Sequence, residues 1–269
     1  MNSNGAVPLD VFFPFGFSNG DDALPRDDDR SSVKVRIPSA FPFMKNNESE
    51  IYVNINGAIS FASEISVYTP RCGPLDTENR MIAVYWADVD TTKWDQSNVF
   101  YRVTGEINLL EKANREIIVA FPKLLYIAIK WLFIATWEKV TYYGADRCRK
   151  PYPSNTFQAT LATDGIHSFV ILYYNQLVWT AGIASNGGNC TGLGGRAAKV
   201  GFDAGDGRNF YAVDGSCTQG ILNMSNLSSG PNITSGKWIF RVDESQFKEH
   251  GQIRLITHGY LSNCIIVFN

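Results

Sequence analysis

Two short runs of β-branched and aromatic residues flank the dipeptide Asn56-Gly57, and this stretch constrains the fold more than any other part of the sequence. Asn and Gly both tolerate positive φ, which a two-residue type I′ hairpin turn requires at both positions. A strand that is apolar on one face must pack that face against another layer. The stretch 51–61 therefore predicts a β-hairpin over a core, with these side chains facing inwards: Ile51, Val53, Ile55, Ile59 and Phe61.

Similar alternation recurs along most of the chain, in short runs separated by turn signals. Asp164-Gly165 predicts a second hairpin between runs 156–163 and 168–174. In the run 129–140, one face carries Trp131, Phe133, Ala135 and Trp137. Many short strands with regular turns are typical of a sandwich. We therefore expect a mostly β protein, an antiparallel β-sandwich.

One segment has a helical period instead. Its apolar residues recur every three or four positions, at Ile107, Leu110, Ala113, Ile117, Ile118 and Phe121. This spacing forms an apolar stripe on an α-helix, and Pro122 ends it. The sequence predicts one substantial α-helix at about residues 106–121.

Composition narrows the class of partner. The 269 residues are 45% apolar and 13% aromatic, enough for a sizeable core. A net charge of −2 gives no general attraction to nucleic acid or to anionic lipid, so we expect neither as a partner. The apolar run 117–137 imitates a membrane span, but Lys123 and Lys130 interrupt it. Because lysine near a bilayer centre is unfavourable, we expect core there and no membrane span in the chain.

Glycosylation sequons and scattered cysteines favour an oxidising, glycosylating compartment. Five Asn-x-Ser/Thr sequons are present, at Asn47, Asn189, Asn223, Asn226 and Asn232. We therefore expect an extracellular protein, either secreted or the ectodomain of a membrane protein. The first residues lack a signal peptide, so we expect a leader upstream of a partial sequence or one that has been trimmed away.

The five cysteines are Cys72, Cys148, Cys190, Cys217 and Cys264. Without a C-x-x-C pair, a zinc ribbon or a thioredoxin-type centre is disfavoured. A Cys190–Cys217 bridge would close a loop of 26 residues and contribute about 3 kcal/mol. We predict that pair and, as the remaining option, Cys72–Cys148. Cys264 is then odd and is expected to pair with something beyond the chain.

Several blocks, taken in order, resemble the nidogen extracellular domain. They include PFG…DD at 14–28, YVNxNGxISF at 52–61, WADVDT at 86–91 and AGDG at 204–207. The match covers about residues 12–243, and its spacing is most similar to the alpha-tectorin type of this domain. We therefore expect a polar N-terminal segment (1–11), the domain (12–243) and a C-terminal tail or the start of a following module (244–269).

The resemblance implies a non-catalytic module associated with cell–matrix adhesion and matrix assembly. Its expected partners are extracellular matrix or cell-surface proteins. The resemblance implies no defined ligand surface.

Asp88 and Asp90 lie two apart on an expected strand, so both carboxylates point the same way. With Asp95 from the following loop they are candidate calcium ligands, because calcium prefers oxygen donors. The alternative is that both acids accept backbone N–H bonds where the strand turns into the loop. The run Asp27–Asp29 is expected to be a solvated loop. A calcium-assisted, lectin-like carbohydrate-binding domain that uses Trp94 is the alternative function.

Catalytic signatures are missing from the sequence. The histidines are His167, His250 and His258, and neither G-x-S-x-G nor H-E-x-x-H occurs. The glycine-rich stretch 192–197 resembles a degenerate dinucleotide fingerprint, but an expected strand follows it where a helix is required. We expect no enzyme activity and no cofactor other than calcium.

Overall fold

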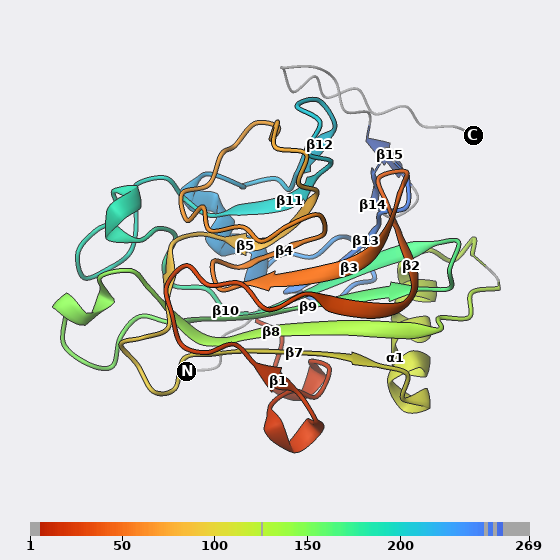
Figure 1. Ribbon diagram of the computed structural model, residues 1–269, viewed down its shortest axis with the longest axis horizontal. Helices are drawn as coiled ribbons and strands as arrows, with labels where there is room; N and C mark the ends of the chain where they lie inside the picture. Colours follow the sequence, from red (N-terminus) through yellow and green to blue (C-terminus); the bar gives the residue numbers. More distant parts are fainter. Residues whose placement is uncertain (1–5, 125, 245–246, 250–251, 255–269) are drawn as a thin grey trace.

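The computed structural model describes residues 6–124, 126–244, 247–249 and 252–254. Within them the chain forms two antiparallel β-sheets and one α-helix, α1 (Ile107–Ala120) (Figure 1). The larger sheet runs β1 (Asp22–Ala23), β7 (Asn98–Thr104), β8 (Trp131–Tyr142), β9 (Asn155–Thr163), β10 (Ser168–Gln176), β13 (Lys237–Arg241), β14 (Phe247–Glu249), β15 (Gln252–Arg254), and β6 (Val89–Asp90) pairs with β8. The six-stranded sheet runs β12 (Phe210–Ala212), β11 (Lys199–Asp203), β5 (Met81–Trp86), β4 (Ala58–Ser60), β3 (Asn46–Asn54), β2 (Val35–Phe43). The predicted sandwich and its helix are confirmed.

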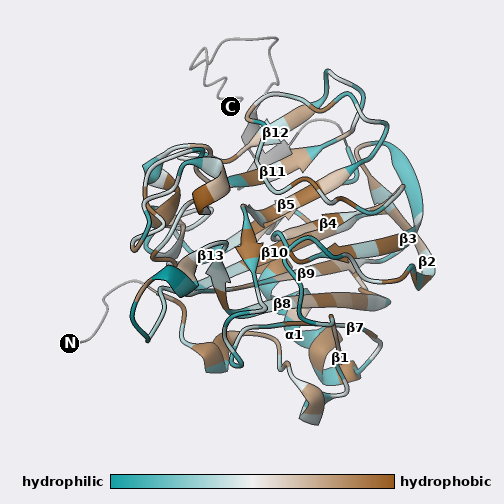
Figure 2. Cartoon of the chain, turned by 60° about the vertical axis from the view of Figure 1, so that its left-hand side comes forward, coloured by the Kyte–Doolittle hydropathy of each residue, from teal (hydrophilic) through white to brown (hydrophobic). Residues whose placement is uncertain are grey.

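The main core fills the space between the two sheets. Apolar residues, drawn in brown, recur along the strands of both sheets and alternate there with more hydrophilic ones (Figure 2). From the larger sheet, β8 sends Trp131, Phe133 and Trp137 into this core. Phe43 and Ile82 come from the smaller sheet. These are the alternating faces that the sequence pattern predicts.

A second core covers the outer face of the larger sheet. Leu132 and Ile134 of β8 point there, where they join Ala113 and Ile117 of α1. Because β8 is buried on both faces, its sequence is an almost continuous apolar run. The membrane-like stretch 117–137 is therefore the end of α1, a connection and the start of β8. No helix in the described part of the chain is long and apolar enough to cross a membrane.

The N-terminal segment packs into the same second core. Val7 and Phe13 are fully buried in it. Lys112 of α1 donates hydrogen bonds from its Nζ to the carbonyls of Val11 and Phe12, at 2.8 Å for Phe12. The packed part of the chain thus begins before residue 12.

The turn between β3 and β4 differs from the predicted two-residue type I′ turn. Asn54 pairs with Ala58, so the loop has three residues. Of these, Gly57 has positive φ, at +77°, and Asn56 does not. Three-residue hairpin loops with a left-handed Gly are the next most common kind. The side chain of Asn56 bonds to Asp29 and to the Val89 amide, both outside the hairpin.

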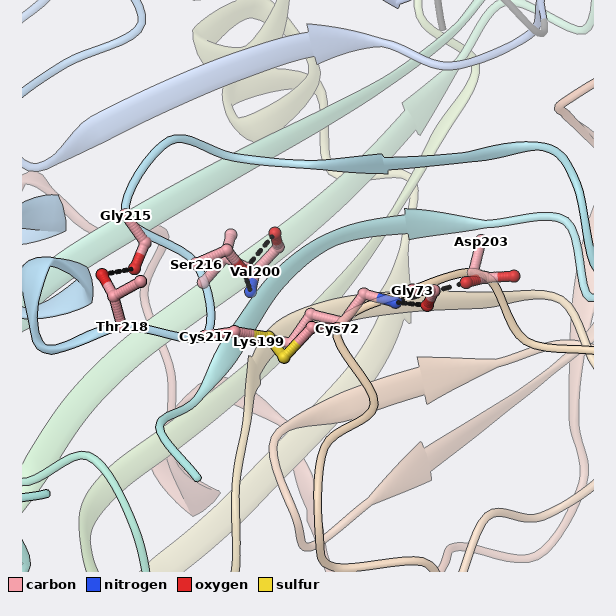
Figure 3. The surroundings of a disulfide bond; sticks show 9 residues. All are labelled: Cys72, Gly73, Lys199, Val200, Asp203, Gly215, Ser216, Cys217 and Thr218. Atoms are coloured by element: carbon pink, nitrogen blue, oxygen red, sulfur yellow. Dashed lines mark hydrogen bonds and ion pairs between the residues drawn. A yellow bond between two sulfur atoms is a disulfide. The ribbon is translucent and has the colours of Figure 1, made fainter. Parts of the chain in front are cut away.

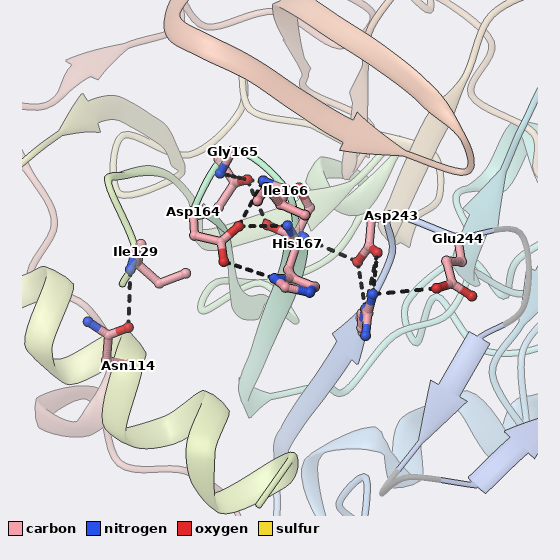
Figure 4. Close-up of polar contacts among 11 residues, drawn as sticks. Asn114, Ile129, Asp164, Gly165, Ile166, His167, Asp243 and Glu244 are labelled. Carbon is pink, nitrogen blue, oxygen red and sulfur yellow. Dashed lines mark hydrogen bonds and ion pairs between the residues drawn. The ribbon is translucent and has the colours of Figure 1, made fainter. Parts of the chain in front are cut away.

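The second predicted hairpin is confirmed and joins β9 to β10, with Thr163 opposite Ser168. Asp164 organises its turn, because its carboxylate accepts hydrogen bonds from the amides of Ile166 (2.8 Å) and His167 (2.6 Å) (Figure 4). The His167 ring lies 2.9 Å from the same carboxylate. The histidine is therefore part of a structural turn.

Both predicted disulfide pairings, Cys190–Cys217 and Cys72–Cys148, are wrong. The bridges are Cys72–Cys217 and Cys148–Cys190. The same four cysteines are used with exchanged partners. Cys264, His250 and His258 lie outside the described residues.

Strand order explains the exchange. Because β11 lies beside β5, the connection that leads into β5 reaches the loop that follows β12. There Lys199 Nζ donates to the Gly73 carbonyl at 3.1 Å, beside the Cys72–Cys217 bridge (Figure 3). At another place, Tyr142 at the end of β8 donates its hydroxyl to the Asn189 carbonyl at 2.9 Å, which brings Cys190 to the loop that carries Cys148. Distance along the chain does not reveal either proximity.

Candidate functional site

Two acidic segments that are far apart in the sequence lie side by side. The Asp27 amide donates to Thr91 Oγ1 (3.0 Å), and the Asp27 carbonyl accepts from the Thr91 amide (3.0 Å). The Thr91 hydroxyl also donates to that carbonyl at 2.8 Å. These bonds hold the acidic loop after β1 against the residues around β6. The four carboxylates of Asp28, Asp29, Asp88 and Asp90 are called the acidic cluster below.

Asn56, in the β3–β4 turn, connects the two segments. Its Nδ2 donates to Asp29 Oδ1 at 2.8 Å, and its Oδ1 accepts the Val89 amide at 2.8 Å. The Gly57 that follows allows the turn to lie against β5, since a Cβ there would stand 2.1 Å from the Tyr85 carbonyl oxygen. The hairpin that dominates the sequence thus anchors the acidic cluster.

Asp88 is the most unusual member of the cluster. It is only 3% exposed, and its Oδ2 is buried with no hydrogen-bond partner in the described structure. Burial, followed by the charges of Asp29, Asp28 and Asp90, raises the pKa of Asp88 to about 7. The neighbouring charges that raise this pKa all belong to carboxylates. Buried polar atoms are normally paired, so the orphaned oxygen calls for an explanation.

Gly182 closes the space beside Asp88. A Cβ at position 182 would lie 2.2 Å from Asp88 Oδ2, so only glycine fits against the carboxylate. The Asp88 carbonyl accepts the Tyr143 amide at 3.0 Å, and the Tyr143 carbonyl accepts the Ile183 amide at 3.0 Å. Three backbone segments therefore hold Asp88 in place.

Asp28 experiences the same repulsion more weakly. Burial, then the charges of Asp29 and Asp90, raises its pKa above the ordinary value. Asp28 and Asp29 are both half-buried. Asp27 differs, because the Arg30 guanidinium pairs with it at 3.0 Å and lowers its pKa. The loop that we expected to be merely solvated thus contributes two carboxylates to the cluster.

Asp90 and Asp95 have separate roles. Asp90 Oδ1 accepts the Thr92 amide at 2.7 Å and the Thr92 hydroxyl at 2.6 Å, the backbone-bonding alternative that the sequence left open. Asp95 is exposed in the following loop. Among the described residues, no three His, Cys, Asp or Glu side chains form a ready-made metal centre. Calcium binding by Asp88, Asp90 and Asp95 stays a prediction.

Sequence reasoning missed the participation of Asp28 and Asp29. The signal was present, because Asp27-Asp28 and the WADVDT block are both parts of the family resemblance. What the sequence could not supply was their contact, which depends on the backbone bonds between Asp27 and Thr91.

The five sequon asparagines are all exposed: Asn47, Asn189, Asn223, Asn226 and Asn232. Asn47 lies on β3, and Asn223 lies in the 3₁₀ helix Gln219–Ser225. Trp94 is half-buried, with its ring 6.3 Å from that of Tyr152 in an edge-on arrangement. All five positions are open to a glycan, whereas only part of Trp94 is open to a ligand.

A family model described as "Nidogen-like domain" matches residues 49–244. Alpha-tectorin of Homo sapiens is 36% identical over 238 residues, which is 88% of this chain and 11% of that protein. Nidogen of Drosophila melanogaster is 30% identical over 223 residues, 81% of this chain and 15% of that protein. Dendrite extension defective protein 1 of Caenorhabditis elegans is 26% identical over 232 residues, 86% of this chain and 18% of that protein.

The chain therefore spans about a tenth of the length of the alpha-tectorins that it matches. No solved structure matches the chain.

Proposed function

The chain belongs to the nidogen-like domain family, and from this premise we propose that it is a non-catalytic extracellular module that supports matrix assembly and cell–matrix adhesion through protein contacts. The observation that carries the proposal is the combination of five exposed sequon asparagines with two disulfides. Disulfides persist in oxidising compartments, and N-glycans need exposed acceptors. The sandwich is suited to such use, because a rigid core supports the loops that make contacts.

Exposed apolar side chains give these loops groups for protein contact. Tyr126 is 96% exposed, Val33 is 78% exposed and Ile166 is 73% exposed. All three lie in connections between strands or between α1 and β8. Large apolar side chains that stay in water favour burial in a partner, although single ones are common on protein surfaces.

Retention in a cell-derived matrix tests the proposal. The chain is secreted with an epitope tag by cultured cells that produce matrix, and the tag is quantified in the medium and in the layer left after the cells are removed. We expect several times more retention than for an unrelated secreted, glycosylated β-sandwich of similar size. Equal retention of the two proteins would contradict the proposal.

The lectin-like alternative predicts a different sensitivity in the same assay. Protein contacts should survive enzymatic removal of glycans from the matrix, whereas lectin binding should be lost. A glycan array probed with calcium present gives an independent answer. Specific binding to one glycan class would favour the lectin, and its absence would favour protein contacts.

A further inference from the structure

The acidic cluster brings four carboxylates together, and none of the ion pairs among the described residues involves Asp88. Like charges in a partly buried site raise one another's pKa values and destabilise the ionised forms. The basic residues of the same loop are engaged elsewhere: Arg30 with Asp27, Arg26 with the Asp95 carbonyl and Lys34 with Glu50. Buried carboxylates are stable only when they are paired, hydrogen-bonded or bound to a metal. Asp88 Oδ2 has no such partner within the described residues.

We propose that Asp88, Asp28 and Asp29 bind a calcium ion, with Asp90 providing further negative charge beside it. The three carboxylates come from two segments that the Asp27–Thr91 bonds hold together. Asn56 fixes the position of Asp29 through a 2.8 Å hydrogen bond. Asp88 offers the buried oxygen that has no other partner among the described residues.

The donor set selects the class of ion. Carboxylate oxygens without a nitrogen or sulfur donor favour hard cations over zinc or copper. Calcium accepts irregular geometry and six to eight oxygens, whereas magnesium demands a near-ideal octahedron. A cluster assembled from two loops and a rigid turn meets the requirements of calcium more readily.

Binding requires a limited rearrangement, since no three of the described acidic side chains already converge on one point. Asp28 is half-buried on the loop, so its side chain has room to turn towards Asp88, whereas Asn56 holds Asp29 where it lies. A shallow surface hollow borders the same loop and is lined in part by Asp27, Asp29 and Val33. Of the four carboxylates of the acidic cluster, Asp29 is the one that lines this hollow, so the hollow opens the Asp29 side of the cluster to solvent.

These calcium ligands differ from those that the sequence alone suggests, which are Asp88, Asp90 and Asp95. In the structure Asp90 is engaged with Thr92, and Asp95 is exposed. The calcium site is independent of the proposed matrix function, because it depends only on the geometry of this chain.

Calorimetry and thermal unfolding test the site on the purified, disulfide-bonded chain. After EDTA treatment and dialysis, calcium is titrated into the wild type, and melting temperatures are recorded with calcium, with magnesium and with EDTA. We expect one calcium ion to bind and to raise the melting temperature, because a ligand of the folded state stabilises it. Magnesium should produce a smaller shift.

Variants locate the ion. Asp88→Asn and Asp28→Asn should each lower calcium affinity at least tenfold and remove most of the melting shift. Asp28 is half-buried, so its variant should fold even if the change at Asp88 is poorly tolerated. Asp95→Ala is the matched control and should leave affinity unchanged. Alanine is used there because asparagine, followed by Gln96 and Ser97, would create a new glycosylation sequon.

The outcomes separate cleanly. Loss of binding in Asp28→Asn with normal binding in Asp95→Ala supports the site. A wild type that binds no calcium and melts at the same temperature in calcium and EDTA overturns it. Binding that survives Asp28→Asn but is lost in Asp95→Ala also overturns it, because the ion would then sit in the loop after β6.

Discussion

Gly57 lies so close to the backbone of β5 that a side chain has no room. Its φ is +77°, and an added Cβ would stand 2.1 Å from the Tyr85 carbonyl oxygen. We expect Gly57→Ala to lower the free energy of unfolding by about 3 kcal/mol or more, through backbone strain plus overlap. Urea unfolding followed by tryptophan fluorescence measures the loss.

Gly20 is a matched control for this change. It has nearly the same φ, at +78°, with nothing within 4 Å of an added Cβ. Gly20→Ala should therefore cost only the left-handed strain, about 1–2 kcal/mol. Equal losses in the two variants would mean that the close approach to β5 is unimportant.

Asp164 gives the β9–β10 turn a dependence on pH. Burial tends to raise its pKa, but the His167 ring and the amides of His167 and Ile166 outweigh burial and leave the pKa below the ordinary 3.8. A carboxyl with a lowered folded pKa contributes stability above its unfolded pKa, and this is lost as pH falls through the folded value. We expect Asp164→Ala to cost about 1–3 kcal/mol at pH 7.

The pH profile of that variant separates the carboxylate from general damage to the turn. The difference in unfolding free energy between wild type and Asp164→Ala should shrink as pH falls below about 4, where the unfolded chain takes up the proton, and should be lost as pH falls through the lower folded pKa. Denaturant titrations between pH 7 and pH 3 measure it. A difference that stays constant over this range would refute the electrostatic account.

At the scale of whole elements, the two disulfides join segments that are far apart in the sequence, and their removal is expected to destabilise the fold. Cys72–Cys217 joins positions 145 residues apart and Cys148–Cys190 joins positions 42 apart. The paired change Cys72→Ser with Cys217→Ser should cost about 2–5 kcal/mol, because the unfolded chain regains its freedom. Thermal unfolding under non-reducing conditions measures the loss.

Peptide mapping without reduction tests the pairing itself. A linked peptide pair that contains Cys72 and Cys217 is expected, together with one that contains Cys148 and Cys190. Recovery of a Cys190–Cys217 pair would contradict the strand order around β11. The wild-type digest after reduction is the control, because both linked pairs should disappear from it.

Sequence reasoning succeeded where the signal is local. The alternation of Trp131 to Trp137 placed the two faces of β8, and the spacing from Ile107 to Phe121 located α1, because each pattern is set by neighbours within the element. It failed where contacts depend on the order of strands. The disulfide partners need β11 beside β5, and the Asp88 environment needs the loop after β1 beside β6. The predicted two-residue turn at Asn56-Gly57 was wrong for a related reason, since the Asn56 side chain bonds to two segments that are distant in the sequence.

At the scale of the whole molecule, the exposed sequons predict a heavily glycosylated protein. Secreted from mammalian cells behind a signal peptide, the chain should lose mass on treatment with peptide-N-glycosidase. Each of the five Asn→Gln variants should lack one glycan while melting near the wild-type temperature, because every one of these side chains is exposed. Intact-mass spectrometry makes the measurement. A secreted chain with no enzyme-sensitive mass would count against an extracellular, glycosylated protein.

The Cys72–Cys217 bridge has a consequence for a protein exposed to proteases. Any single cut between residues 73 and 216 leaves the two fragments joined by a covalent bond. A nicked molecule would migrate as one species on a non-reducing gel and as two after reduction. Cleavage in that long interval would therefore escape notice in an assay that never opens the disulfides, and a damaged molecule would keep both halves in place.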